Sequence, residues 1–306
     1  MFIVRNRKFF YILSGLITGV ALFAMFFYGF NYGIDFKGGS IVEVAYTADR
    51  PDVEAVKQSV LAAHIEGASI RETGDKGLIV RTAHLEEEAR QNLLTALSLN
   101  NSVSMEQKRF DSVGPTLGAE LQGKALFSIL LVMLVIVLFI AFAFRKVSEP
   151  VPSWKYGVIA IVALLHDVIV PAGAFAVLGH FKGAEIDSLF VTALLVILGF
   201  SIHDTIVVFD RVRENLRKNT EYRRKEEFET VVGKSVTQTF ARSINTSLTT
   251  LLTLLVLYLI GSEATRWFSL ALLIGITSGT YSSVFLASPL LVTVEKWQKE
   301  KGAKHK

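Results

Sequence analysis

Two histidine–aspartate pairs interrupt long apolar stretches of the sequence. His166 and Asp167 lie in LLHDVIV, and His203 and Asp204 lie in FSIHDTIVVFD. The pattern H-D-x-I-V recurs at a separation of 37 residues, which indicates an internal repeat or matching sites on neighbouring helices. An ionisable side chain inside a membrane span costs about 2.5–3.5 kcal/mol on insertion scales, so each acid is a functional hypothesis.

Asp204 and Arg242 are the pair that we expect to carry a proton relay. Asp204 lies about five residues past the midpoint of its apolar stretch, which is roughly 7–8 Å along a helix. Arg242 comes just before the next apolar stretch, and its long side chain can reach inward. Such a pair keeps the carboxylate ionised until a proton or a conformational change intervenes, as in proton-driven transporters.

Other interpretations of these residues stay open at this point. Asp204 could be a static packing residue bonded to Ser, Thr or Asn on a neighbouring span, and Arg242 could be an interface anchor. Relay and packing roles are equally open for Asp167. Histidines 166 and 203 are expected to be hydrogen-bonding neighbours. The further intramembrane polar side chains that we single out are Asp167, His203 and Thr246.

Enzymatic and metal chemistry find little support in the sequence. The chain has no Cys, which excludes thiolate nucleophiles, disulfides and iron–sulfur clusters. An intramembrane zinc hydrolase would need a further ligand cluster, and neighbouring His and Asp point about 100° apart on a helix. We therefore expect no catalytic residues, no metal and no cofactor, with the proton as the coupling ion.

The apolar half of the chain forms six stretches that are long enough to cross a bilayer. A span needs roughly 20 apolar residues, and the chain is 51% hydrophobic. The first stretch is too long for a signal peptide and reads as a retained anchor. The six predicted spans are residues 9–30, 124–144, 157–179, 189–209, 244–260 and 268–292.

Basic residues define the expected orientation. The segments 1–8, 145–156, 210–243 and 293–306 contain 20 of the 32 Lys and Arg residues. The positive-inside rule then places both termini in the cytoplasm. These segments have a net charge of +11, which suits anionic lipid headgroups, and no basic stripe for nucleic acid remains. The mixed-charge run 211–228 is expected to lie at the membrane interface.

The predicted domains follow from these spans. They are the N-terminus with the first span (1–30), an extracytoplasmic domain (31–123), a five-helix bundle (124–293) with a cytoplasmic loop at 210–243, and a basic cytoplasmic tail (294–306).

The extracytoplasmic domain is predicted to be α+β. Strand-like segments at 41–47, 68–73, 77–83 and 102–110 alternate with helical segments after Pro51 and at 85–99. The order β-α-β-β-α-β is that of a ferredoxin-like unit. This domain has no cofactor loop, and we expect a docking surface for polypeptide or for a partner domain.

Two pairs of glycines predict close helix packing. Gly15 and Gly19 lie in the first span, and Gly275 and Gly279 lie in the sixth, both at G-x-x-x-G spacing. The sequence leaves open whether each pair packs within this chain or against a partner subunit.

Several blocks of sequence resemble the SecD/SecF family of Sec-type accessory membrane proteins. NYGIDFKGGS (31–40) resembles the family signature after the first span, and VGPTLGAEL (113–121) resembles the next shared block. GFSIHDTIVVFDRVREN (199–215) and ARSINTSLTTLLTLL (241–255) resemble the blocks around the fourth and fifth spans of the SecF branch. The resemblance covers residues 1–295, and six spans with one modest domain also favour that branch.

The resemblance implies a protein of the resistance–nodulation–division superfamily in the bacterial or archaeal cytoplasmic membrane. It implies a SecD-like partner beside the SecY/SecE/SecG channel, with ATP hydrolysis confined to SecA. The pair would use the proton motive force to draw unfolded polypeptide outward across the lipid bilayer. Half of a lipid or small-molecule exporter and a passive scaffold subunit are the alternatives.

The resemblance also assigns roles to particular residues. Asp204 falls on the family's proton-relay carboxylate, and Arg242 falls on its basic partner. Asp35, Gly38 and Gly39 fall in the signature, where a structural hinge is expected. The family often has a small polar residue in place of His203.

Overall fold

The computed structural model describes residues 2–65, 67–145, 150–223 and 226–304, and it is mostly helical with one small sheet. The chain divides into two compact units. One comprises Met1–Asn31 with Phe127–Lys306, and the other is Tyr32–Leu126. We call them the helical bundle and the α+β domain.

Six helical segments within the described residues are long and apolar enough to cross a membrane, which confirms the predicted number and makes the chain a multi-pass membrane protein. A short helix, α1 (Phe2–Arg5), precedes them. The first five spans are α2 (Arg7–Tyr28), α6 (Pro115–Ala143), α7 (Ser153–Lys182), α8 (Ser188–Glu221) and α9 (Phe228–Ile260). The sixth consists of α10 (Glu263–Ser282), a π-helical turn η1 (Ser283–Ala287) and α11 (Ser288–Lys304).

The helices extend further than the predicted spans. Most of the segment 210–243, expected as a loop, belongs to α8, which ends at Glu221, and to α9, which begins at Phe228; the tail from 294 continues α11. Ion pairs one turn apart stabilise the polar end of α8, such as Lys218 with Glu214 at 2.6 Å. Residues 224–225 and 305–306 of these two segments lie outside the described part of the chain.

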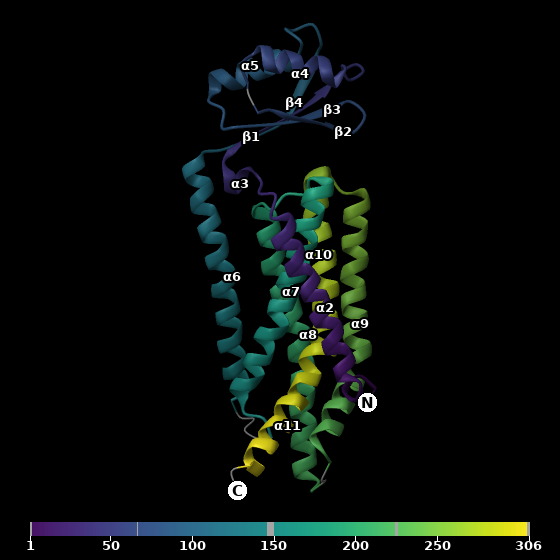
Figure 1. Cartoon of the computed structure of the whole chain (residues 1–306). Helices are drawn as coiled ribbons and strands as arrows, with labels where there is room; N and C mark the ends of the chain where they lie inside the picture. The colour runs from purple at the N-terminus through teal and green to yellow at the C-terminus, as the bar shows by residue number, and fades with distance from the viewer. Residues whose placement is uncertain (1, 66, 146–149, 224–225, 305–306) are drawn as a thin grey trace. The chain divides into compact units, whose positions relative to one another are not determined.

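Three spans form the centre of the bundle. In the most apolar stretch of each span, the buried share of residues is 56% for α7, 50% for α8 and 61% for the sixth span. The corresponding share is 22% for α2, 11% for α6 and 17% for α9. Figure 1 shows α2, α7, α8, α9 and α10 running alongside one another. The outer helices therefore keep broad apolar faces for lipid or for another subunit.

Glycines allow α10 to cross α8 closely. A Cβ atom at Gly279 would lie 2.9 Å from Ser201 Cβ, and one at Gly275 would lie 2.1 Å from Ile197 Cδ1. The second glycine pair thus packs within the chain. A Cβ atom at Gly15 or Gly19 would meet nothing within 4 Å, so that pair lies on an open face of α2.

We expect Gly279→Ala to destabilise the bundle by about 1–3 kcal/mol, because the added methyl must push α8 and α10 apart. Gly199→Ala is the matched control, since its Cβ would meet nothing within 4 Å. That change should be neutral or stabilise by about 1 kcal/mol through helix propensity. Thermal unfolding in detergent measures both, and an unchanged midpoint for Gly279→Ala would contradict the close crossing.

The α+β domain has the predicted order of strands and helices. After α3 (Ile34–Lys37) come β1 (Gly39–Tyr46), α4 (Val53–Ala62), β2 (Ser69–Thr73), β3 (Gly77–Thr82), α5 (Glu87–Leu97) and β4 (Met105–Val113). The sheet order is β2-β3-β1-β4, and every neighbouring pair is antiparallel. The extracytoplasmic, ferredoxin-like assignment of this domain stays a prediction.

The core of the domain lies between the sheet and the helices. Alternate residues of β1 (Val42, Val44 and Tyr46) are buried, as period-two alternation requires. Figure 1 shows α4 and α5 on one face of the sheet. The Tyr46 hydroxyl donates to the Leu97 carbonyl at 2.9 Å, and burial raises the pKa of Tyr46 to about 12.

Candidate functional site

Asp204 lies where three helices of the bundle meet. Its side chain is only 2% exposed on α8. Ser247 of α9 donates a hydrogen bond from Oγ to Asp204 Oδ2 at 3.2 Å, and Thr280 of α10 donates from Oγ1 to Ser247 Oγ at 2.6 Å. A chain of two hydroxyls therefore connects this acid to two neighbouring helices.

Asp167 on α7 is fully buried and accepts four hydrogen bonds. Its Oδ1 receives them from His166 Nδ1 at 2.9 Å and from Ser278 Oγ at 3.2 Å. Its Oδ2 receives them from Ser201 Oγ at 2.5 Å and from Ser282 Oγ at 2.7 Å. Since the donors come from α7, α8 and α10, this carboxyl group ties three helices together.

The two acids differ in how well their charged forms are supported. Hydrogen bonds from neighbouring groups stabilise a carboxylate, and burial opposes it. Asp167 has four such bonds, whereas the described residues give Asp204 one, from Ser247. Gaining or losing a proton thus disrupts fewer interactions at Asp204. Asp167 is thus tied to its neighbours by more hydrogen bonds than Asp204, and the relay or packing role of each acid stays a prediction.

The structure does not bring Arg242 to Asp204. Arg242 is exposed on α9, and among the described residues no ion pair joins the two side chains. The helix face that packs inward carries Ser243 and Ser247, both buried. Adjacent residues point about 100° apart on a helix, so Arg242 is directed away from that face. Its role in a relay stays a prediction.

Polar side chains also lie on the open surface of α8 and α9. His203 and Thr246 are exposed, as are Asn245 and Thr249 near Arg242 on α9. Of these, His203 is an ionisable group within a predicted span, which is costly in lipid and indicates a protein neighbour or a water-filled space. In the described part of the chain, neither His203 nor Thr246 forms a hydrogen bond with the carboxyl group of Asp167 or Asp204.

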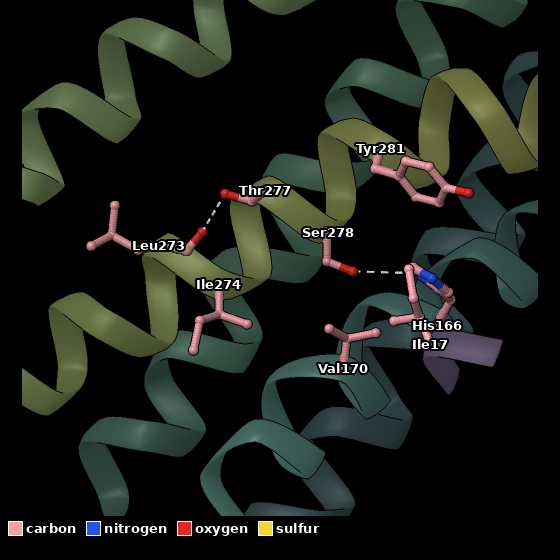
Figure 2. A pocket seen from close by; sticks show the side chains of 8 residues that line it. All are labelled: Ile17, His166, Val170, Leu273, Ile274, Thr277, Ser278 and Tyr281. Carbon is pink, nitrogen blue, oxygen red and sulfur yellow. Dashed lines mark hydrogen bonds between the residues drawn. The ribbon is translucent and has the colours of Figure 1, made fainter. Parts of the chain in front are cut away.

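A cavity of about 540 Å³ lies beside His166, between α2, α7 and α10. Figure 2 shows the side chains that line it and the hydrogen bond between Ser278 Oγ and His166 Nδ1. The His166 Nε2 atom is buried, and no described residue forms a hydrogen bond with it. The lining is otherwise largely apolar and comprises Ile17, His166, Val170, Leu273, Ile274, Thr277, Ser278 and Tyr281.

The predicted hinge residues occupy a tight junction inside the α+β domain. Gly38 and Gly39 have φ angles of 75° and 142°, which side-chain-bearing residues rarely adopt. A Cβ at Gly38 would lie 2.9 Å from Pro115 Cα, and one at Gly118 would lie 2.9 Å from Gly38 N. The two signature blocks therefore contact each other directly. Asp35 lies in the first turn of α3, and a hinge role for these residues stays a prediction.

The sequence reasoning allowed for Ser or Thr partners of Asp204 but did not identify which hydroxyl groups surround the two acids. Their signal was spacing: Ser243 and Ser247 are four residues apart on α9, and so are Ser278 and Ser282 on α10. Such pairs share one helix face. Among the described residues, no group of three or more His, Asp or Glu side chains lies close enough together to bind a metal ion.

Comparisons with known proteins now decide the family. The profile described as "Protein export membrane protein SecD/SecF, C-terminal" matches residues 94–297, and the "SecD/SecF GG Motif" matches residues 23–49. The chain belongs to the SecF family. The two acids and Arg242 lie within the first matched region, and Gly38 and Gly39 lie within the second.

Relatives of this family match over nearly their whole length. The protein translocase subunit SecF of Thermobaculum terrenum is 43% identical over 96% of this chain and 93% of the relative. The SecF subunit of a Synechocystis species is 36% identical, and the match covers 95% of this chain and 93% of that subunit. These two SecF proteins are thus similar to this chain over most of their length.

Solved structures of SecDF are also similar to this chain. SecDF from Thermus thermophilus, described as a translocon-associated membrane protein, matches with a TM-score of 0.80 and 32% identity over 96% of this chain. SecDF in a super-membrane-facing form matches with a TM-score of 0.66 and 32% identity over 99%. This chain spans only 38% and 39% of those two longer chains.

Proposed function

We propose that this protein is an accessory subunit of the Sec preprotein translocase that uses the proton motive force to promote late export of polypeptides. Membership of the SecF family supports the place in protein translocation. The observation that carries the proton-driven part is Asp204, a buried acid at the junction of α8, α9 and α10 whose carboxyl group accepts one hydroxyl bond.

The mechanism that we propose begins with a proton at Asp204. Neutralising the carboxylate changes the hydrogen bond with Ser247 and with it the packing of α8 against α9. In another conformational state of the protein, Arg242 would approach Asp204 and keep the Asp204 carboxylate ionised. The packing change would then swing the α+β domain, which handles the emerging polypeptide.

A SecD-like subunit is the partner that we propose. The solved SecDF chains are much longer than this one and match it over 38% and 39% of their length. The exposed His203, which lies within the predicted fourth span, fits a protein neighbour within the bilayer better than lipid. The SecY/SecE/SecG channel and, indirectly, SecA complete the proposed assembly in the cytoplasmic membrane, with both termini of this chain in the cytoplasm.

Export into sealed inverted membrane vesicles tests this function. Vesicles that contain the translocase, SecA and a SecD-like partner are compared with and without this chain, before and after an uncoupler collapses the proton gradient. We expect the chain to increase late export only while the gradient stands. An increase that survives the uncoupler would contradict proton coupling and leave a scaffold role. Absence of any increase would contradict the export role.

A further inference from the structure

One turn of α10 is hydrogen-bonded directly to Asp167 and, through Ser247 of α9, indirectly to Asp204. Ser278 and Ser282 donate to Asp167, and Thr280, which lies between them, donates to Ser247 and so reaches Asp204. The described residues contain no second helical turn with this double connection. We call residues Ser278–Ser282 the hydroxyl turn.

The hydroxyl of Thr280 has one proton and two acceptors. Its Oγ1 lies 2.6 Å from Ser247 Oγ and 2.8 Å from the carbonyl oxygen of Ile276. When Asp204 is ionised, Ser247 donates to the carboxylate and Thr280 donates to Ser247. When Asp204 carries a proton, its own O–H can donate to Ser247, Ser247 to Thr280, and Thr280 to Ile276. Both arrangements satisfy every group, so the chain can reverse its direction.

The same choice exists at Ser282. Its Oγ donates to Asp167 Oδ2 at 2.7 Å and lies 3.2 Å from the carbonyl oxygen of Gly279. Hydroxyls that bond back to a carbonyl three or four residues earlier bend helices. A change of acceptor at Thr280 therefore alters the geometry of the turn that holds Asp167.

The helix is able to yield just after this turn. The π-helical turn η1 begins at Ser283, directly after Ser282. Pro289 follows in α11 and has no N–H with which to bond the Phe285 carbonyl, which accounts for the irregular turn. Ser288 donates from Oγ to the Ser283 carbonyl at 2.8 Å instead. π-Helical turns inside long helices occur frequently at functional sites.

We propose that the hydroxyl turn couples the two acids, with Thr280 as the positioning residue that responds to the proton on Asp204. Thr280 changes its acceptor from Ser247 to the Ile276 carbonyl, the turn shifts at its junction with η1, and the contacts of Ser278 and Ser282 with Asp167 change. Asp167 thereby transmits the state of Asp204 to α7. This inference rests on the proposed function, in which Asp204 takes up the proton.

Few other ionisable groups lie near the hydroxyl turn. Among the described residues, the helices packed against the hydroxyl turn and η1 carry these titratable or charged side chains in the neighbouring segments: Tyr11 on α2, His166 and Asp167 on α7, His203 and Asp204 on α8, Arg242 on α9 and Tyr281 on α10. Tyr281 donates from its hydroxyl to the Phe10 carbonyl at 3.2 Å, and η1 contains no ionisable residue.

The test measures how fast a hydrophobic carbodiimide modifies Asp204 as a function of pH, by mass spectrometry of the full chain assembled with its partner in membranes. We expect Thr280→Val to move the midpoint of modification toward higher pH by about half a unit, because Ser247 becomes a weaker donor to the carboxylate. Thr280→Ser should restore the midpoint. Thr277→Val is the matched control, since within the described residues the exposed Thr277 hydroxyl bonds the Leu273 carbonyl and neither acid.

Ser282→Ala and Ser278→Ala form the decisive arm, because neither side chain touches Asp204. Coupling predicts that at least one of them moves the Asp204 midpoint, whereas independent acids predict the wild-type value for both. An unchanged midpoint in both, or in Thr280→Val, would overturn the proposal. The modification assay does not depend on export. If the midpoint moves as expected while Asp204→Asn exports normally, the proposed function fails and the coupling stands.

Discussion

Asp204→Asn is expected to remove essentially all of the proton-gradient-dependent export and to leave the gradient-independent part intact. Asparagine has the shape of aspartate and keeps an oxygen that can accept from Ser247, but it cannot ionise. The substitution should therefore change the free energy of unfolding by less than about 1 kcal/mol. Vesicle export with and without an uncoupler, together with thermal unfolding, separates the two effects.

Asp210→Asn is the control for this substitution. Asp210 lies six residues further along α8, is exposed and pairs with Arg213. Surface ion pairs contribute about 0–1 kcal/mol, so export and stability should both stay near wild type. Normal gradient-dependent export by Asp204→Asn would refute the relay role. A loss of export accompanied by a large loss of stability would show that Asp204 is a packing residue.

Asp167→Ala is expected to cause the largest loss of stability, about 3 kcal/mol. The substitution removes an acceptor from four buried donors: His166 Nδ1, Ser201 Oγ, Ser278 Oγ and Ser282 Oγ. Each hydrogen bond between membrane helices contributes about 0.6 kcal/mol on average, and the cavity left by the side chain adds to the cost. Unfolding of the full chain by a denaturing detergent measures the loss.

Asp167→Asn should be intermediate between the wild type and Asp167→Ala. Its amide keeps one oxygen for two of the donors but turns an NH2 group toward the others. Asp210→Ala, at an exposed position of α8, should shift stability by less than about 0.5 kcal/mol. If Asp167→Ala also changed the free energy of unfolding by less than about 0.5 kcal/mol, the four hydrogen bonds to Asp167 would not hold the bundle together.

Local patterns in the sequence were sufficient to predict the six spans and the order of strands and helices in the α+β domain. Twenty-residue apolar runs predict spans because unpaired backbone groups are too costly in lipid, and alternation predicts the strands of the α+β domain because strand side chains alternate between faces. Those arguments use neighbouring residues only. They did not predict that α8 extends to Glu221, since the end of a span in the bilayer need not be the end of its helix.

The sequence by itself also identified the acids at 167 and 204, because ionisable residues are rare in apolar runs and need no tertiary contact to be noticed. Only the tertiary structure decided what surrounds them. Serine and threonine are common in spans and often bond their own helix, so their pattern does not reveal which of them face a distant acid. The close crossing at Gly279 brings Ser201, Ser282 and Asp167 together, and the outward direction of Arg242 separates it from Asp204. Both outcomes depend on how helices far apart in the chain rotate against one another, and packing between them fixes that rotation.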